Sequence, residues 1–404
     1  RASATESDRR AAAMEIGGWA TGEITALGVT RISATIERGA DPAPVLEVIG
    51  RMPGVALAEL DTRVWIDAAP SDPYWVTDPL TPGLGQWGAR KIALDRALDL
   101  VGTLQPVLVA VVDTGVALVH PDLAGVVQDG RTFLSTPNAS CVPDKIGGDD
   151  NSHGTHVAGI IAANANNGIG IAGVASNARI LPVKALDCTG VGSMSDIAEG
   201  ITYAVDRGAK IVNISLGTSS DSPTLAAAVR YALARNVLVV AATGNCGNGP
   251  VRCFNTVNLP EYPGAYPGVI GVGATATDDT IASFSTQGTQ VAISAPGVRI
   301  VSTTPTYQTF QSRAGAPMSY AAFSGTSQAT PFVTGVAALL MGTDPTLTAQ
   351  QVADRLKQTA DDLGVPGADP AFGAGRLNAL RAVNTVAPAF AAKYDTTAVA
   401  RAAT

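Results

Sequence analysis

Runs of aliphatic residues along the middle of the chain constrain its fold more than any other feature. Each run is made almost entirely of Val, Ile, Leu and Ala. Strands that are apolar on both faces are typical of the centre of a parallel sheet covered on both sides. The runs are PVLVAVVD (106–113), ARILPVKAL (178–186), AKIVNISLG (209–217), NVLVVAATGN (236–245) and VIGVGAT (269–275).

Segments with helical periodicity follow or separate these runs. They span residues 155–163, 195–206, 223–235, 327–341 and 349–359. The repeated order of strand, helix and strand predicts an α/β fold, with an open, doubly wound, mainly parallel sheet flanked by helices.

The first part of the chain follows a different pattern and predicts a small α+β unit over residues 1–68. We expect helices at 6–16 and 44–52, a strand at 30–37, and a hairpin or paired strands within 55–66. A stretch rich in Pro and Asp follows and suggests a domain boundary, so the larger domain spans 69–386. The Ala-rich tail, 387–404, lacks a clear apolar face and is expected to be a loose end or the start of a linker. Because the sequence opens without Met and without an apolar signal segment, we expect a processed or trimmed product.

Composition narrows the possible functions. Acidic residues outnumber basic ones by 34 to 27, and the chain has no Lys/Arg-rich run, which disfavours a nucleic-acid partner. No apolar stretch is long enough to predict a membrane span. With three histidines, any imidazole chemistry must use His120, His153 or His156.

Three residues at the predicted edges of elements are candidates for chemistry. Asp113 ends the first aliphatic strand, where ligands bind in an open parallel sheet. His153 opens the helix HGTHVAG, and Ser327 lies on a turn of small residues before the helix FVTGVAALL. Each also has a plain structural interpretation, as a turn Asp, a buried histidine or a helix N-cap. Metal catalysis is disfavoured because no paired Cys or HExxH accompanies the histidines. The GxGxxG match at 168–173 follows a helix rather than a strand, so it does not predict a dinucleotide site.

The order Asp, His, Ser, together with VAVVDTGV (109–116), HGTHVAG (153–159) and SGTSQATPFVTGVAALL (324–340), resembles the subtilisin-like serine proteases, or subtilases. The resemblance covers about residues 71–386. Two positions depart from the family pattern: Gln328 replaces the usual Met after the serine, and Thr243 replaces a usual Ala.

The resemblance implies a secreted serine endopeptidase that is made as a zymogen. Ser327 would attack the scissile carbonyl, His153 would act as general base and acid, and Asp113 would orient the imidazole. Asn245 would donate to the oxyanion together with the Ser327 backbone N–H. We expect extended peptide substrates, no nucleic-acid or membrane partner, and a monomer.

The resemblance also assigns a substrate-binding set and a calcium site. Glu261, just before Tyr262-Pro263, would lie near the floor of the pocket for the P1 side chain. A preference for Lys or Arg at P1 and a solvated glutamate beside an apolar pocket remain open alternatives. The substrate-binding residues are Gly190, Val191, Gly192, Ser215, Leu216, Gly217, Ala242, Thr243, Gly244 and Glu261. The Ca²⁺ ligands would be the side chains of Asp72, Asp122 and Asn167 and the carbonyls of Ala165, Ile169 and Ile171.

The N-terminal unit resembles, more loosely, the inhibitory propeptide of subtilases. Its first strand is expected to be missing from this chain, and self-cleavage is expected near residues 68–70. The unit would then act as the enzyme's own inhibitor.

Four cysteines allow three pairings. Cys246 and Cys253 flank a Gly/Pro loop and form the natural local pair, which leaves Cys141 with Cys188. Free buried thiols remain an alternative.

Two other functions compete with a general endopeptidase. One is a processing protease with selective cleavage at basic P1 residues. The other is a catalytically silent binding protein on the same scaffold.

Overall fold

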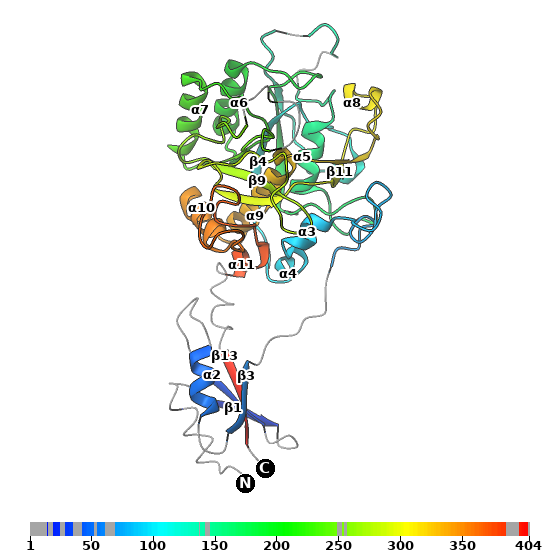
Figure 1. The fold of residues 1–404 in the computed structure, drawn as a ribbon. Coiled ribbons are helices and arrows are strands. Elements are labelled where there is room, and N and C mark those ends of the chain that lie inside the picture. Colours follow the sequence, from blue (N-terminus) through cyan, green and yellow to red (C-terminus); the bar gives the residue numbers. More distant parts are fainter. Residues whose placement is uncertain are drawn as a thin grey trace. The chain divides into compact units, whose positions relative to one another are not determined.

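The computed structural model describes residues 14, 19–24, 29–34, 43–51, 55–60, 69–136, 138–141, 146–248, 253, 257–384 and 396–402. The chain divides into two compact units (Figure 1). One unit contains Arg1–Asp67 with Ala387–Thr404, and the other contains Ala68–Val386.

The larger unit is built on a seven-stranded sheet in which all neighbouring strands are parallel. This confirms the predicted α/β class and the parallel sheet. The strand order is β10-β9-β8-β7-β4-β6-β5. The strands are β4 (Val107–Asp113), β5 (Arg131–Thr132), β6 (Ala178–Lys184), β7 (Ile211–Ile214), β8 (Leu238–Ala242), β9 (Ile270–Thr275) and β10 (Ile293–Pro296).

Strand β4 is the topological switch point of the sheet, where the strand order reverses direction. After β4 the chain builds β5 and β6 on one side, and then β7 to β10 on the other. In open parallel sheets the connections leave such a point in opposite directions, which opens a crevice at the carboxyl ends of the strands. Asp113, the last residue of β4, lies at that crevice.

Helices cover both faces of this sheet because alternate residues of each strand point to opposite sides. Ala110 and Val112 of β4 pack in one core cluster with Ile201 and Leu225, from α6 and α7. Helices α5 and α9 pack on each other, and Thr334 of α9 donates to Asn213 of β7 at 2.7 Å. The helices are α3 (Trp87–Lys91), α4 (Leu94–Leu98), α5 (His153–Ala162), α6 (Met194–Asp206), α7 (Pro223–Leu233), α8 (Phe310–Arg313), α9 (Thr326–Thr343), α10 (Ala349–Gln358) and α11 (Ala379–Asn384).

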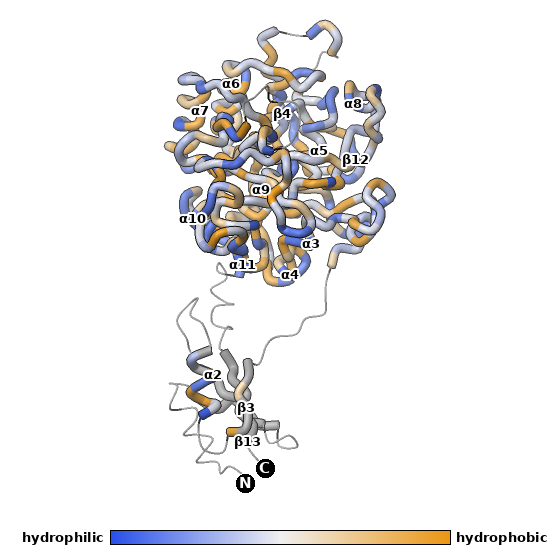
Figure 2. Tube along the Cα trace, viewed as in Figure 1, coloured by the Kyte–Doolittle hydropathy of each residue, from blue (hydrophilic) through white to orange (hydrophobic). Residues whose placement is uncertain are grey.

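Helix α9 is deeply buried, with sixteen of its 18 residues buried. In Figure 2, which colours the chain by hydropathy, the label of α9 lies in the middle of the larger unit. Pro331 lies inside the helix and has no N–H to donate to the carbonyl four residues earlier, that of Ser327. The Ser327 carbonyl instead accepts from the Ser215 hydroxyl at 3.0 Å.

The long predicted elements of this unit are present, within a few residues of their expected bounds. The antiparallel pair β11 (Ile300–Thr303) and β12 (Tyr320–Phe323) was not predicted, because both strands are short and the intervening loop is long. Among the described residues, no helix combines the length and the apolar character that crossing a bilayer requires.

The smaller unit contains an antiparallel four-stranded sheet with the order β1-β2-β13-β3. Its described elements are β1 (Trp19–Ile24), β2 (Val29–Ala34), α2 (Ala43–Gly50), β3 (Val55–Leu60) and β13 (Thr396–Ala402). The predicted helix at 6–16 lies outside the described residues, apart from Met14, and so does the stretch 61–68.

The prediction of a loose C-terminal tail was wrong for β13. This strand pairs with β2 on one side and β3 on the other, so it lies inside the sheet. A central strand of this kind is stabilised by hydrogen bonds to both neighbours, which its Ala-rich composition does not reveal.

A buried ion pair ties the ends of β4 and β6 to the start of α5. Lys184 is opposite Asp113 in the β4–β6 pairing. Its Nζ donates to Asp150 Oδ1 and to the Thr114 carbonyl, both at 2.6 Å, and the lysine side chain is 1% exposed.

Replacing Lys184 by Met would leave the Asp150 carboxylate buried without its partner. We expect the free energy of unfolding to fall by about 3–5 kcal/mol, as measured by urea denaturation. The matched control is the double variant Lys184→Met/Asp150→Asn, which removes both charges and should recover much of the loss. Equal losses in the single and double variants would contradict this expectation.

Candidate active site

His153 and Asp113 meet at the crevice beside β4. Asp113 is fully buried, and its Oδ1 lies 2.8 Å from His153 Nδ1. The same oxygen accepts from the Thr114 N–H at 2.7 Å, which fixes the carboxylate at the end of the strand. This contact holds the imidazole with Nδ1 as donor and leaves Nε2 as its free nitrogen.

Asp149 holds the start of α5, the helix that His153 opens. Its carboxylate accepts the N–H groups of Asn151, Ser152 and Thr155 at 2.9–3.0 Å. It also accepts the hydroxyls of Thr114 and Thr155, at 2.9 and 2.6 Å. An anion that takes up the free N–H groups of a first helical turn stabilises that turn. The same carboxylate links the turn after β4 to α5.

The charges around His153 favour its protonated form. Burial lowers the pKa of this imidazole, but the Asp113 charge and hydrogen bond and the Asp149 charge outweigh burial and raise the pKa above the ordinary value. His153 is 22% exposed, so a substrate group can reach it.

Ser327 is the second residue of α9 and is partly exposed. Its hydroxyl donates to the Ser215 carbonyl at 2.9 Å, and among the described contacts it has no hydrogen bond to His153. Catalytic hydrogen bonds are often long or misaligned in unliganded enzymes. As the second helical residue, Ser327 has a backbone N–H without an acceptor inside the helix.

Asn245 faces the same helix start. Its Oδ1 accepts from the Thr326 N–H at 2.9 Å and from the Thr326 hydroxyl at 3.1 Å. Because the carbonyl oxygen is used in this way, the Asn245 NH₂ group is left to donate elsewhere. The structure therefore brings Asn245 and Ser327 together at the N-terminus of α9.

The other two histidines are structural. His156 is fully buried, and its Nε2 donates to the carbonyls of Ile300 and Ala321 at 3.0 and 3.1 Å. Burial lowers the pKa of His156 to about 3. His120 Nε2 donates to the Ser319 carbonyl while Nδ1 accepts from the Asp122 N–H, and burial lowers its pKa.

The predicted pocket walls lie directly after two central strands. Ser215, Leu216 and Gly217 follow β7, whereas Ala242 ends β8 and Thr243 and Gly244 come next. Thr218 pairs with Tyr262 through hydrogen bonds of 3.0 and 2.8 Å, which brings Glu261 beside these walls. Thr243 stands where the family pattern has Ala, and its additional hydroxyl donates to the Val272 carbonyl at 3.1 Å.

Gly190 and Val191 lie in a turn, and Gly192 follows it; none of the three belongs to a paired strand among the described residues. Asp187 closes the turn, because its N–H donates to the Val191 carbonyl at 2.8 Å and its Oδ1 accepts the Val191 N–H at 3.1 Å. Val191 is 65% exposed.

The predicted calcium ligands come together around the loop at 164–171. Asp72 and Asp122 are both buried, and Asp72 accepts the N–H groups of Asn166 and Asn167. Burial and the nearby Asp72 charge raise the pKa of Asp122. The Asn167 amide donates to Asp122 at 2.8 Å.

The backbone of this loop also offers free oxygens. Among the described residues, the carbonyls of Ala165, Ile169 and Ile171 accept no hydrogen bond. Two buried carboxylates and free carbonyl oxygens are a hard-ligand set that fits Ca²⁺.

Both predicted disulfides are present, Cys141–Cys188 and Cys246–Cys253. Within the described part of the chain, the one cluster of His, Cys, Asp or Glu with metal-ligand spacing is Cys141, Asp150 and Cys188. Its two sulfurs are joined in the first bridge, so they are not free thiolate ligands.

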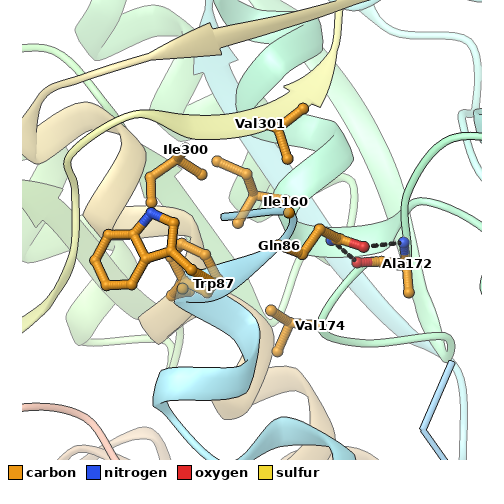
Figure 3. A pocket seen from close by; sticks show the side chains of 10 residues that line it. Gln86, Trp87, Ile160, Ala172, Val174, Ile300 and Val301 are labelled. Carbon is orange, nitrogen blue, oxygen red and sulfur yellow. Dashed lines mark hydrogen bonds between the residues drawn. The ribbon is translucent and has the colours of Figure 1, made fainter. Parts of the chain in front are cut away.

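A small, mainly apolar cavity lies apart from these residues. Figure 3 shows Trp87, Ile160, Ile300 and Val301 around it. At its edge the Gln86 amide makes two hydrogen bonds with the backbone of Ala172, at 2.7 and 2.8 Å. The Gln86 amide is therefore already paired and is not free to bind a ligand. We interpret the cavity as a small gap in the packing between α3, α5 and β11.

Sequence reasoning missed Asp149 and Lys184. The doublet Asp149-Asp150 just before a helix start was an available N-cap signal. No local signal identifies Lys184 as buried. A single lysine at the end of an aliphatic run is also what an exposed strand end would show.

Comparison with known proteins gives concordant matches. The sequence profile described as the subtilase family matches residues 105–375. Thermitase from Thermoactinomyces vulgaris is 40% identical over 317 residues, which cover 78% of this chain and 99% of that protein. Subtilisin Savinase from Lederbergia lenta is 40% identical over 294 residues, covering 72% of this chain and 96% of that protein. The solved structure of a protease from Pseudoalteromonas arctica superposes with a TM-score of 0.65 at 30% identity, covering 79% of this chain and all of that one.

Replacing Asp113 by Asn would remove the charge that faces His153, and we expect the pKa of His153 to fall. Titration of the ring nitrogens by NMR measures it, since the pKa values of His120 and His156 are lowered and these histidines respond at lower pH. Asp129→Asn, an exposed position outside the site, is the matched control and should leave the pKa of His153 unchanged. An unchanged midpoint in Asp113→Asn would contradict the expectation.

Proposed function

Because the chain belongs to the subtilase family and is a serine endopeptidase, we propose that Asp113, His153 and Ser327 are its catalytic triad. The observation that carries this proposal is the 2.8 Å contact between His153 Nδ1 and the buried Asp113 carboxylate. The enzyme class leaves no support for the catalytically silent binding protein.

In the proposed mechanism, Ser327 Oγ attacks the scissile carbonyl while His153 Nε2 takes its proton. For this step the serine hydroxyl must turn from the Ser215 carbonyl toward the imidazole. His153 then protonates the leaving amine, and an acyl-enzyme forms on Ser327. Water hydrolyses the acyl-enzyme with His153 again as base, and Asp113 stabilises the imidazolium in both halves.

We propose that the oxyanion is bound by the Asn245 side-chain amide and the Ser327 N–H. The two hydrogen bonds from Thr326 support this role, because they hold the Asn245 amide in one orientation. A donor held in place before the reaction loses no orientational freedom as negative charge develops. The start of α9 adds the favourable potential of a helix N-terminus.

Substrate would bind as an extended segment along Gly190–Gly192 and Ser215–Gly217. The exposed Val191 turn supports this, because its edge is accessible to a peptide. Segments 215–217 and 242–244, with Glu261, would form the P1 pocket.

A second candidate function is a processing protease that prefers Lys or Arg at P1. The observation that favours it is the position of the Glu261 carboxyl group, which approaches the backbone of both Gly217 and Gly244. An anion between the two pocket walls would pair with a cationic side chain.

We propose that Asp72, Asp122, Asn167 and the carbonyls of Ala165, Ile169 and Ile171 hold a structural Ca²⁺. The ion would neutralise the two buried carboxylates and join the loop after α5 to the stretch that follows the smaller unit. No catalytic step depends on it.

We also propose that the enzyme is secreted and made as a zymogen, with residues 1–68 as an inhibitory unit that is cut near 68–70. Two disulfides support an oxidising compartment. The enzyme would act as a monomer.

Ser327→Ala should abolish labelling by a fluorophosphonate probe and lower kcat by about 10⁶, because the nucleophile is lost. Asn245→Ala should keep the labelling site but lower kcat by about 10²–10³. Mass spectrometry of labelled protein and peptide hydrolysis measure both effects. Persistent labelling of Ser327→Ala would rule out Ser327 as the nucleophile.

A calcium chelator should lower the melting temperature of the wild-type protein, because ligand binding to the folded state stabilises it. Asp122→Asn should melt lower than the wild type and respond less to chelator and to added Ca²⁺. Asp129→Asn, a change outside the proposed ligand set, is the matched control and should retain the full response. A wild-type melting temperature that is indifferent to chelator would contradict the calcium site.

A further inference from the structure

The Glu261 side chain ends between two glycines that face each other across the proposed P1 pocket. A methyl group built on Gly244 would lie 2.1 Å from Glu261 Cδ, and one built on Gly217 would lie 2.8 Å from Oε2. The carboxyl group therefore occupies space that is open because neither wall carries a side chain there. Any P1 side chain that enters between these walls must meet this carboxyl group.

The backbone of Glu261 is held, so the side chain is the part that can adjust. Tyr262 next to it exchanges two hydrogen bonds with Thr218, and the Glu261 carbonyl accepts the Ala265 N–H at 2.9 Å. Among the described residues, the carboxyl group has no hydrogen-bond or ion-pair partner, and burial alone shifts its pKa.

Charged groups are scarce around this carboxyl. The two walls, 215–217 and 242–244, contain no titratable side chain. On its own segment the titratable neighbours are Tyr262 and Tyr266, and the Tyr266 hydroxyl bonds to Asp221. Arg252, in the loop between Cys246 and Cys253, lies outside the described residues.

Burial without a counter-charge raises the pKa of Glu261 to about 7. The free carboxyl group therefore changes its charge near neutral pH, where an ordinary glutamate is fully ionised.

Resting on the proposed endopeptidase function, we infer that Glu261 is a proton-controlled specificity residue: ionised, it selects Arg or Lys at P1, and protonated, it accepts uncharged P1 side chains. A partly buried carboxylate without a partner is costly, and a cationic P1 group supplies the partner. The protonated carboxyl is a neutral hydrogen-bonding group, so it gives a cation no such compensation and can instead donate to a polar, uncharged side chain.

The test compares two peptide substrates that differ only at P1, one with Arg and one with Gln, between pH 5.5 and 9. The measured quantity is the ratio of their kcat/KM values. Titration of His153 and changes in the fraction of folded enzyme affect both substrates equally, so they cancel in this ratio. We expect the Arg/Gln ratio to rise by about tenfold or more through a midpoint near pH 7.

Variants separate Glu261 from other causes. In Glu261→Gln the ratio should be low and independent of pH, whereas Glu261→Asp should keep a pH-dependent ratio. Arg252, which lies outside the described residues, is the remaining charged side chain in the nearby loop. Arg252→Gln tests it and should leave the pH midpoint of the Arg/Gln ratio unchanged. A flat wild-type ratio, the same rise in Glu261→Gln, or a midpoint that moves in Arg252→Gln would each overturn the inference.

Fluorophosphonate labelling of every variant counts the functional active sites, so a variant that fails to fold is recognised. Loss of labelling or of all peptide cleavage in the wild type would instead refute the proposed triad chemistry. An enzyme that is labelled and cleaves both peptides with a flat ratio would refute the Glu261 switch alone.

Discussion

The Asp149 carboxylate is the interaction on which the geometry of the site depends. It accepts hydrogen bonds from three backbone N–H groups and two hydroxyls, and these donors belong both to the turn after β4 and to the start of α5. Asp113 lies at the end of that strand and His153 at the beginning of that helix. Their 2.8 Å contact therefore follows from how one buried carboxylate joins two elements that the parallel sheet brings together.

Helix α9 carries Ser327, and a different set of hydrogen bonds holds the start of this helix. Pro331 cannot donate to the Ser327 carbonyl, and that carbonyl bonds instead to Ser215, the first residue after β7. The Ser215 hydroxyl in turn accepts from Asn213, and Thr334 one turn beyond Pro331 donates to Asn213. Where the backbone donor is missing, the Ser327 segment, which carries the proposed nucleophile, is fixed to the central sheet through Ser215.

The strands of the larger unit could be predicted well from the sequence. Strands that are buried on both faces consist mainly of aliphatic residues, and this composition can be recognised without tertiary information. The sequence also predicted His153, Asp113, Ser327 and Asn245 as a set, and the structure brings them together in two pairs. The tail was missed because β13 is defined by pairing with strands more than 300 positions earlier, which no local pattern encodes. Asp149 was missed because a capping carboxylate has the same local signature whether it lies at the surface or in the interior. Glu261 could be predicted as a pocket residue from the sequence. The absence of a partner for its carboxyl group could not, because it depends on how the surrounding segments pack.

The partly buried Glu261 also separates the conditions that favour folding from those that favour catalysis. Its pKa is raised in the folded state, so its contribution to stability is greatest below the pKa of about 4.5 for the unfolded chain and is lost as the pH rises toward 7. His153 imposes the opposite demand, because as the proposed general base it must lose its proton, and its pKa is raised as well. Lowering the pH therefore favours the folded state through Glu261 while it keeps His153 protonated, so the two groups favour opposite directions of pH change.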